Sequence, residues 1–306
     1  METKMLASSI KSSLKKIHPV YSLWTKTKNR EKFSNESLLL KGQHKTENQH
    51  PTALVFTSHK CASVYVAKIL KDSARDVGMT PIDLDGYFWD TGKPESEVYA
   101  DQNRLEEVIK PVGYLYCPFR KFIDIPKLEK YRILLMLRDP RDVLTSLYFS
   151  SAYSHADSPA LGVLKDRQKA LGQTIKDRQK ALGQTIDEFV IDKSDLYLQR
   201  YRQYCQNLFG KPNVLFVKYE EMVTDFNTWF NKVTDFLELN VSQKLVNQIA
   251  STADFKVEKE DIYAHKRQVM PGEHKRKLKP ETISLLNSKF HEVLSTLDYA
   301  KTGQKC

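Results

Sequence analysis

Cysteines and long hydrophobic runs are scarce in this sequence. Only four cysteines occur in 306 residues and no two form a C-x-x-C pair, which is typical of a protein in a reducing compartment. No segment near the start has the continuous apolar core of a signal peptide or of a membrane-spanning helix. We therefore expect a soluble, cytoplasmic protein.

Acidic residues are missing from the first part of the chain. None occurs between Lys4 and Arg30, and the apolar residues from Leu6 to Ile17 fall on one helical face. This pattern predicts a basic helix that packs on the domain, makes weak contact with a membrane surface or serves as a transit peptide. The polar stretch 29–51 predicts a linker. We thus expect a basic N-terminal extension and linker over residues 1–50, followed by one domain over 51–306.

Basic residues outnumber acidic ones by 48 to 38, which gives a formal net charge of +10. Such a protein attracts polyanions, anionic membranes or a multiply charged small substrate. Part of the charge is local, because the segment KDRQKALGQTI occurs at 165–175 and again at 176–186. Each copy has three basic residues and one acidic residue, so the pair supplies +4 of the +10. This weakens the case for nucleic-acid binding.

The repeat predicts a duplicated helical insertion over 165–186. Eleven residues are close to three helical turns, so a second copy lengthens a helix without rotating its apolar face. Gly172 and Gly183 allow a break or a hinge. We interpret the repeat as a duplication tolerated in a surface element, and a lid on the substrate side is the alternative.

Glycine is absent from residues 52–63, a stretch typical of a strand, a tight loop and a helix start. The apolar run 53–56 predicts a parallel strand buried on both faces. Ser58 or Ser63 can cap the helix, whose free amides and dipole attract anions. Because Lys60 adds a positive charge at the same place, the loop predicts an anion site. An ordinary turn with a solvated lysine is the alternative.

A second strand and helix are predicted around LRDPRD. The run 133–137 is apolar, and the Asp-Pro pair that follows is typical of a helix start. Arg138 then projects from the carboxyl end of a strand, where open α/β sheets bind ligands, and Ser146 lies about two turns into the helix. An arginine and a hydroxyl can share one phosphate. A salt bridge from Arg138 to Asp142 is the alternative.

Two later segments extend this pattern. Residues 214–217 form another apolar run that the sequence Lys-Tyr-Glu follows, and a basic loop near the end contains Arg267 and a Pro-Gly pair. Three apolar strands therefore each end in a polar or basic turn. We predict a parallel α/β sheet with anion-binding groups gathered at one edge.

At these positions the sequence resembles the sulfotransferases that use 3′-phosphoadenosine 5′-phosphosulfate (PAPS) as donor. The family signature T-Y-P-K-S-G-T-T-W is similar to residues 57–65, and its spaced Arg, Pro and Ser are matched from Arg138 to Ser146. Its K-Y-E occurs at 218–220. Its late R-K-G-x-x-G-D-W-K is echoed by RQVMPGEHK, which begins at Arg267.

The resemblance implies a P-loop-like, three-layer α/β fold with a central, mainly parallel sheet of about five strands flanked by helices. It implies in-line transfer of the sulfuryl group to a hydroxyl or amine of a small-molecule acceptor, without a metal. Lys60 would neutralise charge on the bridging oxygen, and Tyr65 would stack on the adenine. The implied donor-binding residues are Ser58, His59, Lys60, Cys61, Ala62, Ser63, Val64 and Tyr65, which lie on the 5′-phosphosulfate and adenine side, with Arg138, Ser146 and Arg267 at the 3′-phosphate.

The sequence departs from this family at the loop glycine and at the general base. Ala62 stands where the family has glycine. The family strand K-T-H-L-P, whose histidine is the base, corresponds to residues 114–118, which contain no histidine. Related branches use a carboxylate in the region that corresponds to PIDLDGYFW, so we predict that Asp85 takes the acceptor's proton. The alternatives are Asp83, His59 and Tyr116, and either aspartate could also be a turn residue before Gly86.

Other classes of protein could also use a lysine between a strand and a helix. A P-loop nucleotide kinase or phosphotransferase needs loop glycines that residues 52–63 lack. A nucleic-acid-binding or membrane-surface protein would exploit the charge, but the aromatic residues are not interleaved with basic ones. Cys61 as a nucleophile would be favoured by Lys60 and a helix N-terminus, yet His59 is its one evident base. We expect a small-molecule acceptor, no nucleic-acid partner, and a monomer or homodimer.

Overall fold

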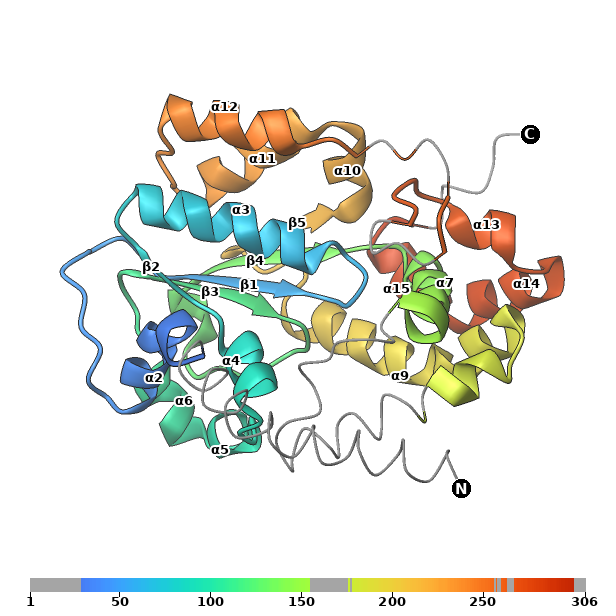
Figure 1. Cartoon of the computed structure of the whole chain (residues 1–306), viewed down its shortest axis with the longest axis horizontal. Coiled ribbons are helices and arrows are strands. Elements are labelled where there is room, and N and C mark those ends of the chain that lie inside the picture. The colour runs from blue at the N-terminus through green and yellow to red at the C-terminus, as the bar shows by residue number, and fades with distance from the viewer. Residues whose placement is uncertain are drawn as a thin grey trace, which may run out of the picture.

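The computed structural model describes residues 29–154, 176, 178–255, 257, 260–262 and 267–299. Within these residues, five parallel strands form one sheet in the order β2-β3-β1-β4-β5, and helices cover both of its faces (Figure 1). The predicted three-layer α/β fold is confirmed. The strands are β1 (Ala53–Thr57), β2 (Thr80–Ile82), β3 (Tyr114–Phe119), β4 (Arg132–Leu137) and β5 (Val214–Lys218).

The central strand β1 is buried along its whole length. Because side chains alternate across a strand, Leu54 and Phe56 belong to one hydrophobic cluster while Ala53 and Val55 belong to the other. This explains why the strand is a continuous apolar run in the sequence rather than an alternating one.

Two layers of helices enclose the sheet, and a further group of helices lies near the carboxyl ends of the strands (Figure 1). Over one face are α3 (Ser63–Asp76), α10 (Tyr219–Thr224), α11 (Phe226–Phe236) and α12 (Gln243–Thr252). Over the other are α2 (Ser34–Leu40), α4 (Leu84–Thr91), α5 (Ser96–Tyr99), α6 (Gln102–Val108) and α9 (Ile186–Asn207). Near the strand ends are α7 (Pro140–Phe149), α13 (Glu273–Lys277), α14 (Pro280–Lys289) and α15 (His291–Thr296).

The strand order places a topological switch point at the ends of β1 and β4. From β1 the chain adds β2 and β3 on one side of β1, and it then adds β4 and β5 on the other side. The connections therefore diverge between these two strands, and ligands bind at such switch points in open α/β sheets. Both loops that the sequence singled out leave the sheet at this point.

The start of α3 differs from the sequence prediction. Neither Ser58 nor Ser63 caps the helix, because the cap position is Ala62, which has no side-chain capping hydrogen bond. Ala62 adopts a left-handed conformation with φ of 54°, as does Lys60 with φ of 65°. Such backbone costs about 1 kcal/mol for a residue with a side chain, whereas glycine adopts it freely.

The prediction of a polar linker over 29–51 is wrong. This segment contains α2, and Phe33, Glu36 and Leu39 are buried. The Asn48 side-chain amide also donates to the Val77 carbonyl oxygen. The side chains of Phe33 and Leu39 are enough to attach residues 29–51 to the domain, because both are part of the larger hydrophobic cluster. The basic segment before it, residues 1–28, lies outside the described residues.

The repeat is described only in its second copy. Arg178 Nε donates to the Ala152 carbonyl oxygen, Ala181 is fully buried, and helix is interrupted near Gly183 before α9 begins. Thr185 then caps α9 in a capping box with Glu188. The helix thus breaks at Gly183, one of the two glycines that allow a break or a hinge, and the first copy, with Gly172, lies outside the described residues. Among the described helices, none combines the length and the apolar character needed to cross a membrane.

Candidate active site

The loop after β1 brings a lysine and a buried hydroxyl to the end of the central strand. Ser58 and Cys61 have no exposed surface, and His59 is the exposed residue of the loop. Ser58 Oγ has no hydrogen-bond partner among the described residues. Because buried polar atoms are nearly always paired in the functional state of a protein, this hydroxyl is a candidate ligand contact.

Lys60 lies close to two arginines that come from distant parts of the chain. Burial, followed by the charges of Arg138 and Arg267, lowers the pKa of Lys60 to about 8. Arg138 Nη1 also donates to the Lys60 carbonyl oxygen over 3.2 Å. The structure therefore brings together the three cations that the sequence proposed for one site, and their mutual repulsion favours an anionic ligand.

Arg138 is buried at the carboxyl end of β4. Its guanidinium lies over the ring of Tyr219, 4.5 Å from the ring centre. Its Nη2 is 3.8 Å from Asp142 Oδ2 and 3.9 Å from Glu273 Oε2, and neither Nε nor Nη2 has a hydrogen-bond partner among the described residues. The predicted salt bridge to Asp142 thus exists, but its length leaves the Nε and Nη2 donors available to a phosphate.

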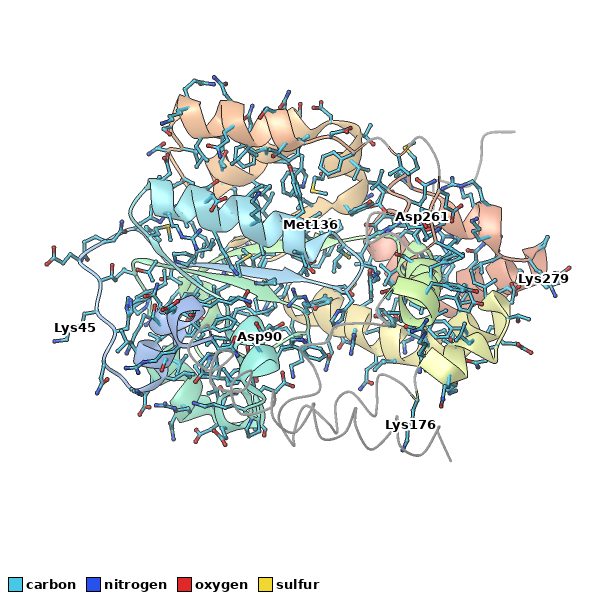
Figure 2. All side chains as sticks on the ribbon, viewed as in Figure 1. Lys45, Asp90, Met136, Lys176, Asp261 and Lys279 are labelled. Carbon is cyan, nitrogen blue, oxygen red and sulfur yellow. The ribbon has the colours of Figure 1, made fainter. Side chains whose placement is uncertain are left out.

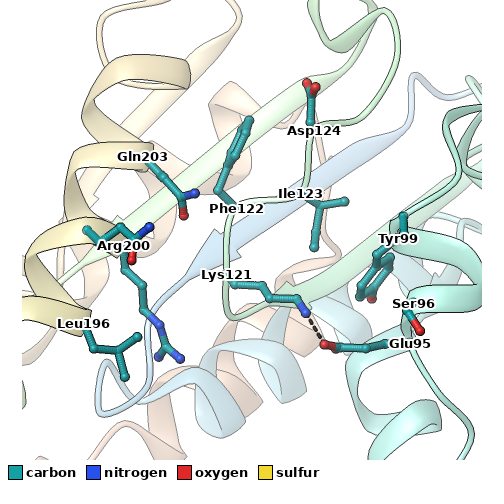
Figure 3. A pocket seen from close by; sticks show the side chains of 12 residues that line it. Glu95, Ser96, Tyr99, Lys121, Phe122, Ile123, Asp124, Leu196, Arg200 and Gln203 are labelled. Atoms are coloured by element: carbon teal, nitrogen blue, oxygen red, sulfur yellow. Dashed lines mark hydrogen bonds and ion pairs between the residues drawn. The ribbon is translucent and has the colours of Figure 1, made fainter. Parts of the chain in front are cut away.

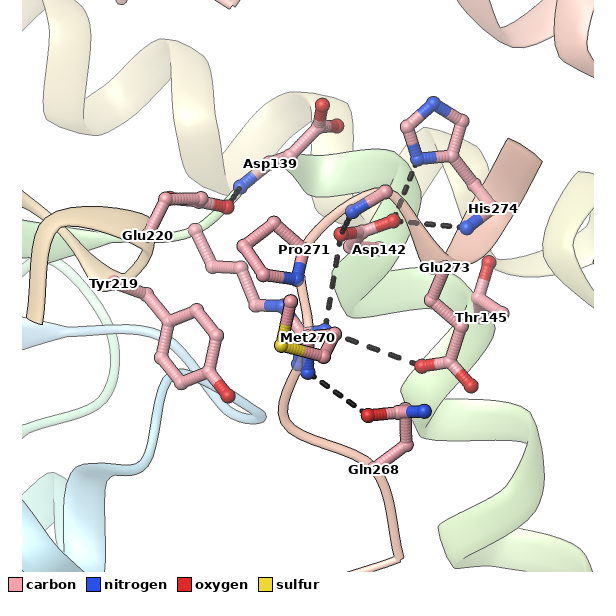
Figure 4. A network of polar contacts seen from close by, with 12 residues as sticks. Asp139, Asp142, Thr145, Tyr219, Glu220, Gln268, Met270, Pro271, Glu273 and His274 are labelled. Carbon is pink, nitrogen blue, oxygen red and sulfur yellow. Dashed lines mark hydrogen bonds and ion pairs between the residues drawn. The ribbon is translucent and has the colours of Figure 1, made fainter. Parts of the chain in front are cut away.

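Arg267 belongs to the late basic loop and packs against α7. Its guanidinium lies 3.9 Å from the centre of the Phe149 ring and forms hydrogen bonds with Glu260 and Glu273. Figure 4 shows Glu273 and Asp142 among the polar groups that surround this loop. Glu273 lies close to both Arg267 and Arg138, so it links the two arginines of the candidate phosphate site.

Asp142 attaches the late loop to α7 (Figure 4). Its oxygens accept hydrogen bonds from Gly272 N over 2.7 Å, from His274 N over 2.9 Å and from His274 Nδ1 over 2.5 Å. Burial would raise the pKa of Asp142, but the hydrogen bonds from His274 and the charge of Arg138 lower it to about 2. The carboxylate is therefore ionised near neutral pH.

Ser146 lies on α7 between two residues that face this loop. Residues four and three apart share a helical face, so Ser146 lies on the same face as Asp142 and Phe149. It is half-buried. Its position is consistent with a place beside Arg267.

The K-Y-E sequence at the end of β5 holds the site together. The Tyr219 hydroxyl donates to the Val269 carbonyl oxygen over 2.8 Å, and Glu220 Oε1 accepts from Asp139 N over 3.0 Å. Asp139 itself caps α7, as its Asp-Pro sequence predicted. The sequence alone indicated no role for K-Y-E. In the structure, Tyr219 and Glu220 hold the late loop and the start of α7 in position.

The two candidate aspartates have different environments. Asp83 caps α4 through Gly86 N and pairs with Lys71 at 2.5 Å, as expected of a turn residue. Asp85 Oδ1 accepts from the Tyr99 hydroxyl over 3.0 Å, and its Oδ2 accepts from Arg120 N over 3.0 Å. Burial raises the pKa of Asp85, which suits a group that must accept a proton.

The other candidates for chemistry are less suited to it. The Tyr116 hydroxyl donates to the Val108 carbonyl oxygen and accepts from Lys110 N inside the core. Burial raises the pKa of the Cys61 thiol to about 12, so the expectation that the helix N-terminus and Lys60 would favour its thiolate is wrong. His59 remains on the exposed side of the loop.

A pocket of about 450 Å³ lies beside the loop that follows β3 (Figure 3). Residues from α5 and its flanks, from 121–124 and from α9 line it, among them Tyr99, Phe122 and Leu196. Arg120 precedes this lining, and its Nε donates to Ser63 Oγ at the start of α3 over 3.2 Å. Arg120 thus contacts the start of α3 while the next residue, Lys121, lines the pocket.

Sequence reasoning missed Arg120 and Tyr99. Arg120 follows the buried strand β3, which is the same signal that identified Lys60 and Arg138. The resemblance to the family draws attention instead to residues 114–118, where the family histidine is absent. Tyr99 gave no local signal, because it meets Asp85 through packing between separate helices.

Comparison with known proteins decides between the classes that this geometry allows. Residues 117–293, more than half of the chain, match the sulfotransferase domain family. The chain belongs to this family. The sulfotransferase match covers β4, β5 and the late loop, but it begins after Lys60. No curated protein matches the chain.

One solved structure supports the same fold, and two others show a weaker similarity. The chain is similar to mouse sulfotransferase SULT7A1 complexed with PAP, with a TM-score of 0.52 and 16% identity over 86% of this chain and 93% of the mouse chain. For retinol dehydratase in a complex with retinol and PAP, the TM-score is 0.47 at 14% identity over 84% of each chain. For a sulfotransferase from Alicyclobacillus acidocaldarius, it is 0.39 at 16% identity over 81% of this chain and 94% of that chain.

Proposed function

We propose that this sulfotransferase moves the sulfuryl group of PAPS to a hydroxyl or an amine of a small-molecule acceptor by in-line transfer. The observation that carries the proposal is the convergence of Lys60, Arg138 and Arg267 at the ends of β1 and β4. Three clustered cations suit a donor with a phosphosulfate and a second phosphate. The PAP in the mouse relative supports this donor, because PAP is PAPS without its sulfuryl group.

PAPS could bind to the buried polar atoms that lack a hydrogen-bond partner among the described residues. We assign the loop from Ser58 to Val64 to the 5′-phosphosulfate, where Ser58 Oγ and backbone amides would donate. We assign Arg138, Ser146 and Arg267 to the 3′-phosphate. Arg138 Nε and Nη2 are buried donors without a partner among the described residues, which supports this assignment.

We place the adenine against Tyr65, in the first turn of α3. The Tyr65 ring meets Phe255 edge-on with ring centres 5.4 Å apart, and Phe226 at 6.2 Å. A flat base can bind to such an aromatic group by stacking. Tyr65 thus replaces the tryptophan of the family signature.

Lys60 would act on the charge that develops during transfer. As the sulfur–oxygen bond to the phosphate breaks, negative charge grows on the bridging oxygen, and a positioned ammonium stabilises it. With a pKa of about 8, Lys60 is largely protonated at neutral pH. The proposed step uses positioning and electrostatics, and no metal takes part in it.

The acceptor would bind in the pocket beside the loop after β3. Lys121 lines this pocket and its neighbour Arg120 donates to Ser63, which supports an acceptor site next to the proposed phosphosulfate site. We propose Asp85 as the general base, because burial raises its pKa whereas Asp83 is occupied as a cap and in a salt bridge. An attacking hydroxyl or amine loses its proton to this base.

Binding of adenosine 3′,5′-bisphosphate (PAP) tests the donor site. At a hundredfold excess over its dissociation constant, PAP should stabilise the protein by about 2.7 kcal/mol, which is measured as a rise in Tm. Arg138→Ala should abolish this rise. Arg202→Ala is the matched control, since Arg202 pairs with Glu292 on the exposed side of α9 and should leave the shift intact.

Three results would contradict this function. They are the absence of a shift with PAP, a larger shift with ATP and Mg²⁺, and an unchanged shift in Arg138→Ala. The folding of Arg138→Ala is checked first by thermal melting without ligand. If Arg138→Ala does not fold, Arg138→Lys is used in its place, because it keeps the charge but loses the guanidinium fork.

The acceptor, the location and the oligomeric state remain predictions. Transfer of labelled sulfate from PAPS to a panel of alcohols, phenols and amines would identify the acceptor class. The proposed cytoplasmic location agrees with the free thiols of Cys61, Cys117 and Cys205. Sedimentation would show whether the protein is a monomer or a homodimer.

A further inference from the structure

The proposed base and the proposed acceptor pocket do not meet directly. Tyr99 lines the pocket, whereas Asp85 is not part of its lining. Both oxygens of Asp85 already accept hydrogen bonds, Oδ1 from the Tyr99 hydroxyl and Oδ2 from Arg120 N. A proton that leaves an acceptor in this pocket therefore needs a group between the two.

Tyr99 is held where it can be that group. Its ring packs edge-on against Phe88, with ring centres 5.5 Å apart, and against Phe119 at 6.2 Å. These contacts fix the ring, and the hydroxyl that bonds to Asp85 keeps its lone pairs for a second partner. Figure 3 shows Tyr99 at the edge of the pocket, opposite α9.

Burial and the surrounding negative charges keep Tyr99 protonated. Burial, followed by the charge of Asp85, raises the pKa of Tyr99, and Glu95 and Asp83 act in the same direction. Arg120 is the cation beside Asp85. The Tyr99 hydroxyl therefore releases its proton to Asp85 only when it accepts a proton from another group.

We propose that Tyr99 is a catalytic residue that passes the acceptor's proton to Asp85. The acceptor oxygen forms its bond to sulfur while the bond from sulfur to the phosphate oxygen breaks. The acceptor's proton moves to the Tyr99 oxygen, the Tyr99 proton moves to Asp85 Oδ1, and PAP leaves with the electron pair. This inference rests on the proposed function and adds a residue to it.

Two acceptor probes with different acidity test the relay. 4-Nitrophenol is largely ionised near neutral pH and needs little help from a base, whereas 2-phenylethanol keeps its proton. With labelled PAPS, Tyr99→Phe should lower kcat for 2-phenylethanol by about a hundredfold and kcat for 4-nitrophenol by less than threefold or so. The KM for PAPS and the Tm shift with PAP should not change.

Variants of the pair separate a relay from a packing role. Asp85→Asn should show the same dependence on the acceptor, and the double variant should lose no more activity than either single one. Tyr87→Phe is the control, since it removes a hydroxyl from α4 that bonds to Lys93 and lies outside the pocket lining. It should keep its activity toward both probes.

The outcomes distinguish a failure of the Tyr99 relay from a failure of the proposed sulfotransferase function. Equal losses for both probes in Tyr99→Phe, or additive losses in the double variant, would overturn the relay. So would full activity of Tyr99→Phe beside an inactive Asp85→Asn. A wild-type protein that binds PAP but sulfates neither probe would overturn the pocket as the acceptor site, whereas a failure to bind PAP would overturn the proposed function itself.

Discussion

At the scale of single residues, Lys60 combines a positive charge with burial. Desolvation and the charges of Arg138 and Arg267 lower its pKa to about 8, so its proton is held far less firmly than that of an exposed lysine. A bound anion would offset this repulsion. Because little water surrounds the Lys60 ammonium, its attraction to negative charge that develops during a reaction is only weakly screened.

This residue predicts an alkaline limit to activity. Because the folded pKa of Lys60 is about 8, kcat/KM for PAPS should fall as the pH rises through that value and the ammonium is lost. Lys60→Met should lower kcat by about a hundredfold to a thousandfold, while Lys68→Met, at an exposed position of α3, should be neutral.

Lys60→Arg provides the decisive comparison, because an arginine keeps its charge at this pH. Its weaker activity should persist above pH 8 in a profile of kcat/KM. The same alkaline decline in Lys60→Arg would show that another group causes the limit.

Lys60 and Arg138 could be predicted because each one follows an apolar run, and the parallel arrangement of strands brings the ends of those runs together. Arg267 follows a polar stretch, and the resemblance of its loop to the late family motif indicated it. Tyr99 could not be predicted in this way. Its partner Asp85 lies on another helix, and their contact depends on how α4 and α5 pack.

At the scale of elements, Asp142 makes α7 and the late loop one unit. It lies in the first turn of α7 and accepts backbone hydrogen bonds from Gly272 and His274. The loop that carries Arg267 is thereby anchored to the helix that carries Ser146. A single buried carboxylate thus sets the relative positions of two proposed phosphate ligands.

Replacement of Asp142 by asparagine should reduce stability in a pH-dependent way. The folded pKa of about 2 is below the ordinary value of 3.8, so the stabilising contribution is complete above pH 3.8 and is lost as the pH falls toward 2. The shift corresponds to about 2 kcal/mol. In urea unfolding, the gap between wild type and Asp142→Asn should be large at pH 7 and smaller at pH 3.

The same variant should weaken PAP binding, because the loop with Arg267 loses its anchor. Asp235→Asn, at an exposed position of α11, should change neither property. A stability gap that stays constant from pH 7 to pH 3 would contradict the role assigned to the ionised carboxylate.

Element boundaries were harder to predict than the strands themselves. The run 53–56 indicated β1 because burial on both faces requires apolar residues throughout. The start of α3 depends instead on the backbone of Ala62, and no capping side chain marks it. The helix at Ser34–Leu40 was missed because its stability comes from contact with the core and not from its own polar sequence.

At the scale of the whole molecule, the order of strands determines where the site lies. The sequence predicted parallel strands with basic ends, but it could not give the order β2-β3-β1-β4-β5. That order depends on which apolar faces meet in the core, a property of the whole chain.

Removal of one copy of the repeat tests whether it is more than a tolerated duplication. The shortened sequence is the same whichever copy is removed, and it keeps Arg178, Ala181 and Thr185 with their contacts. Shortening a connection by eleven residues changes its closure free energy by less than about 1 kcal/mol. The Tm should change by only a few degrees, and the PAP shift should persist.

Deletion of residues 181–185 is the contrasting variant. It removes buried Ala181 and the Thr185 cap, so it should lower Tm clearly. If removal of a whole copy instead raised the acceptor KM tenfold with Tm unchanged, the alternative of a lid would gain support over a tolerated duplication.

Tyrosine hydroxyls occupy the ends of the two strands that frame the site. Tyr204 donates to the Thr57 carbonyl oxygen, Tyr201 to that of Arg138 and Tyr299 to that of Leu137. Such carbonyls would otherwise be bound by solvent that a ligand must displace. Because rigid rings take the place of that solvent, these strand ends are held in position before any ligand arrives, and less ordering entropy is lost on binding. Association should therefore be limited by diffusion and charge attraction rather than by rearrangement of the strand ends.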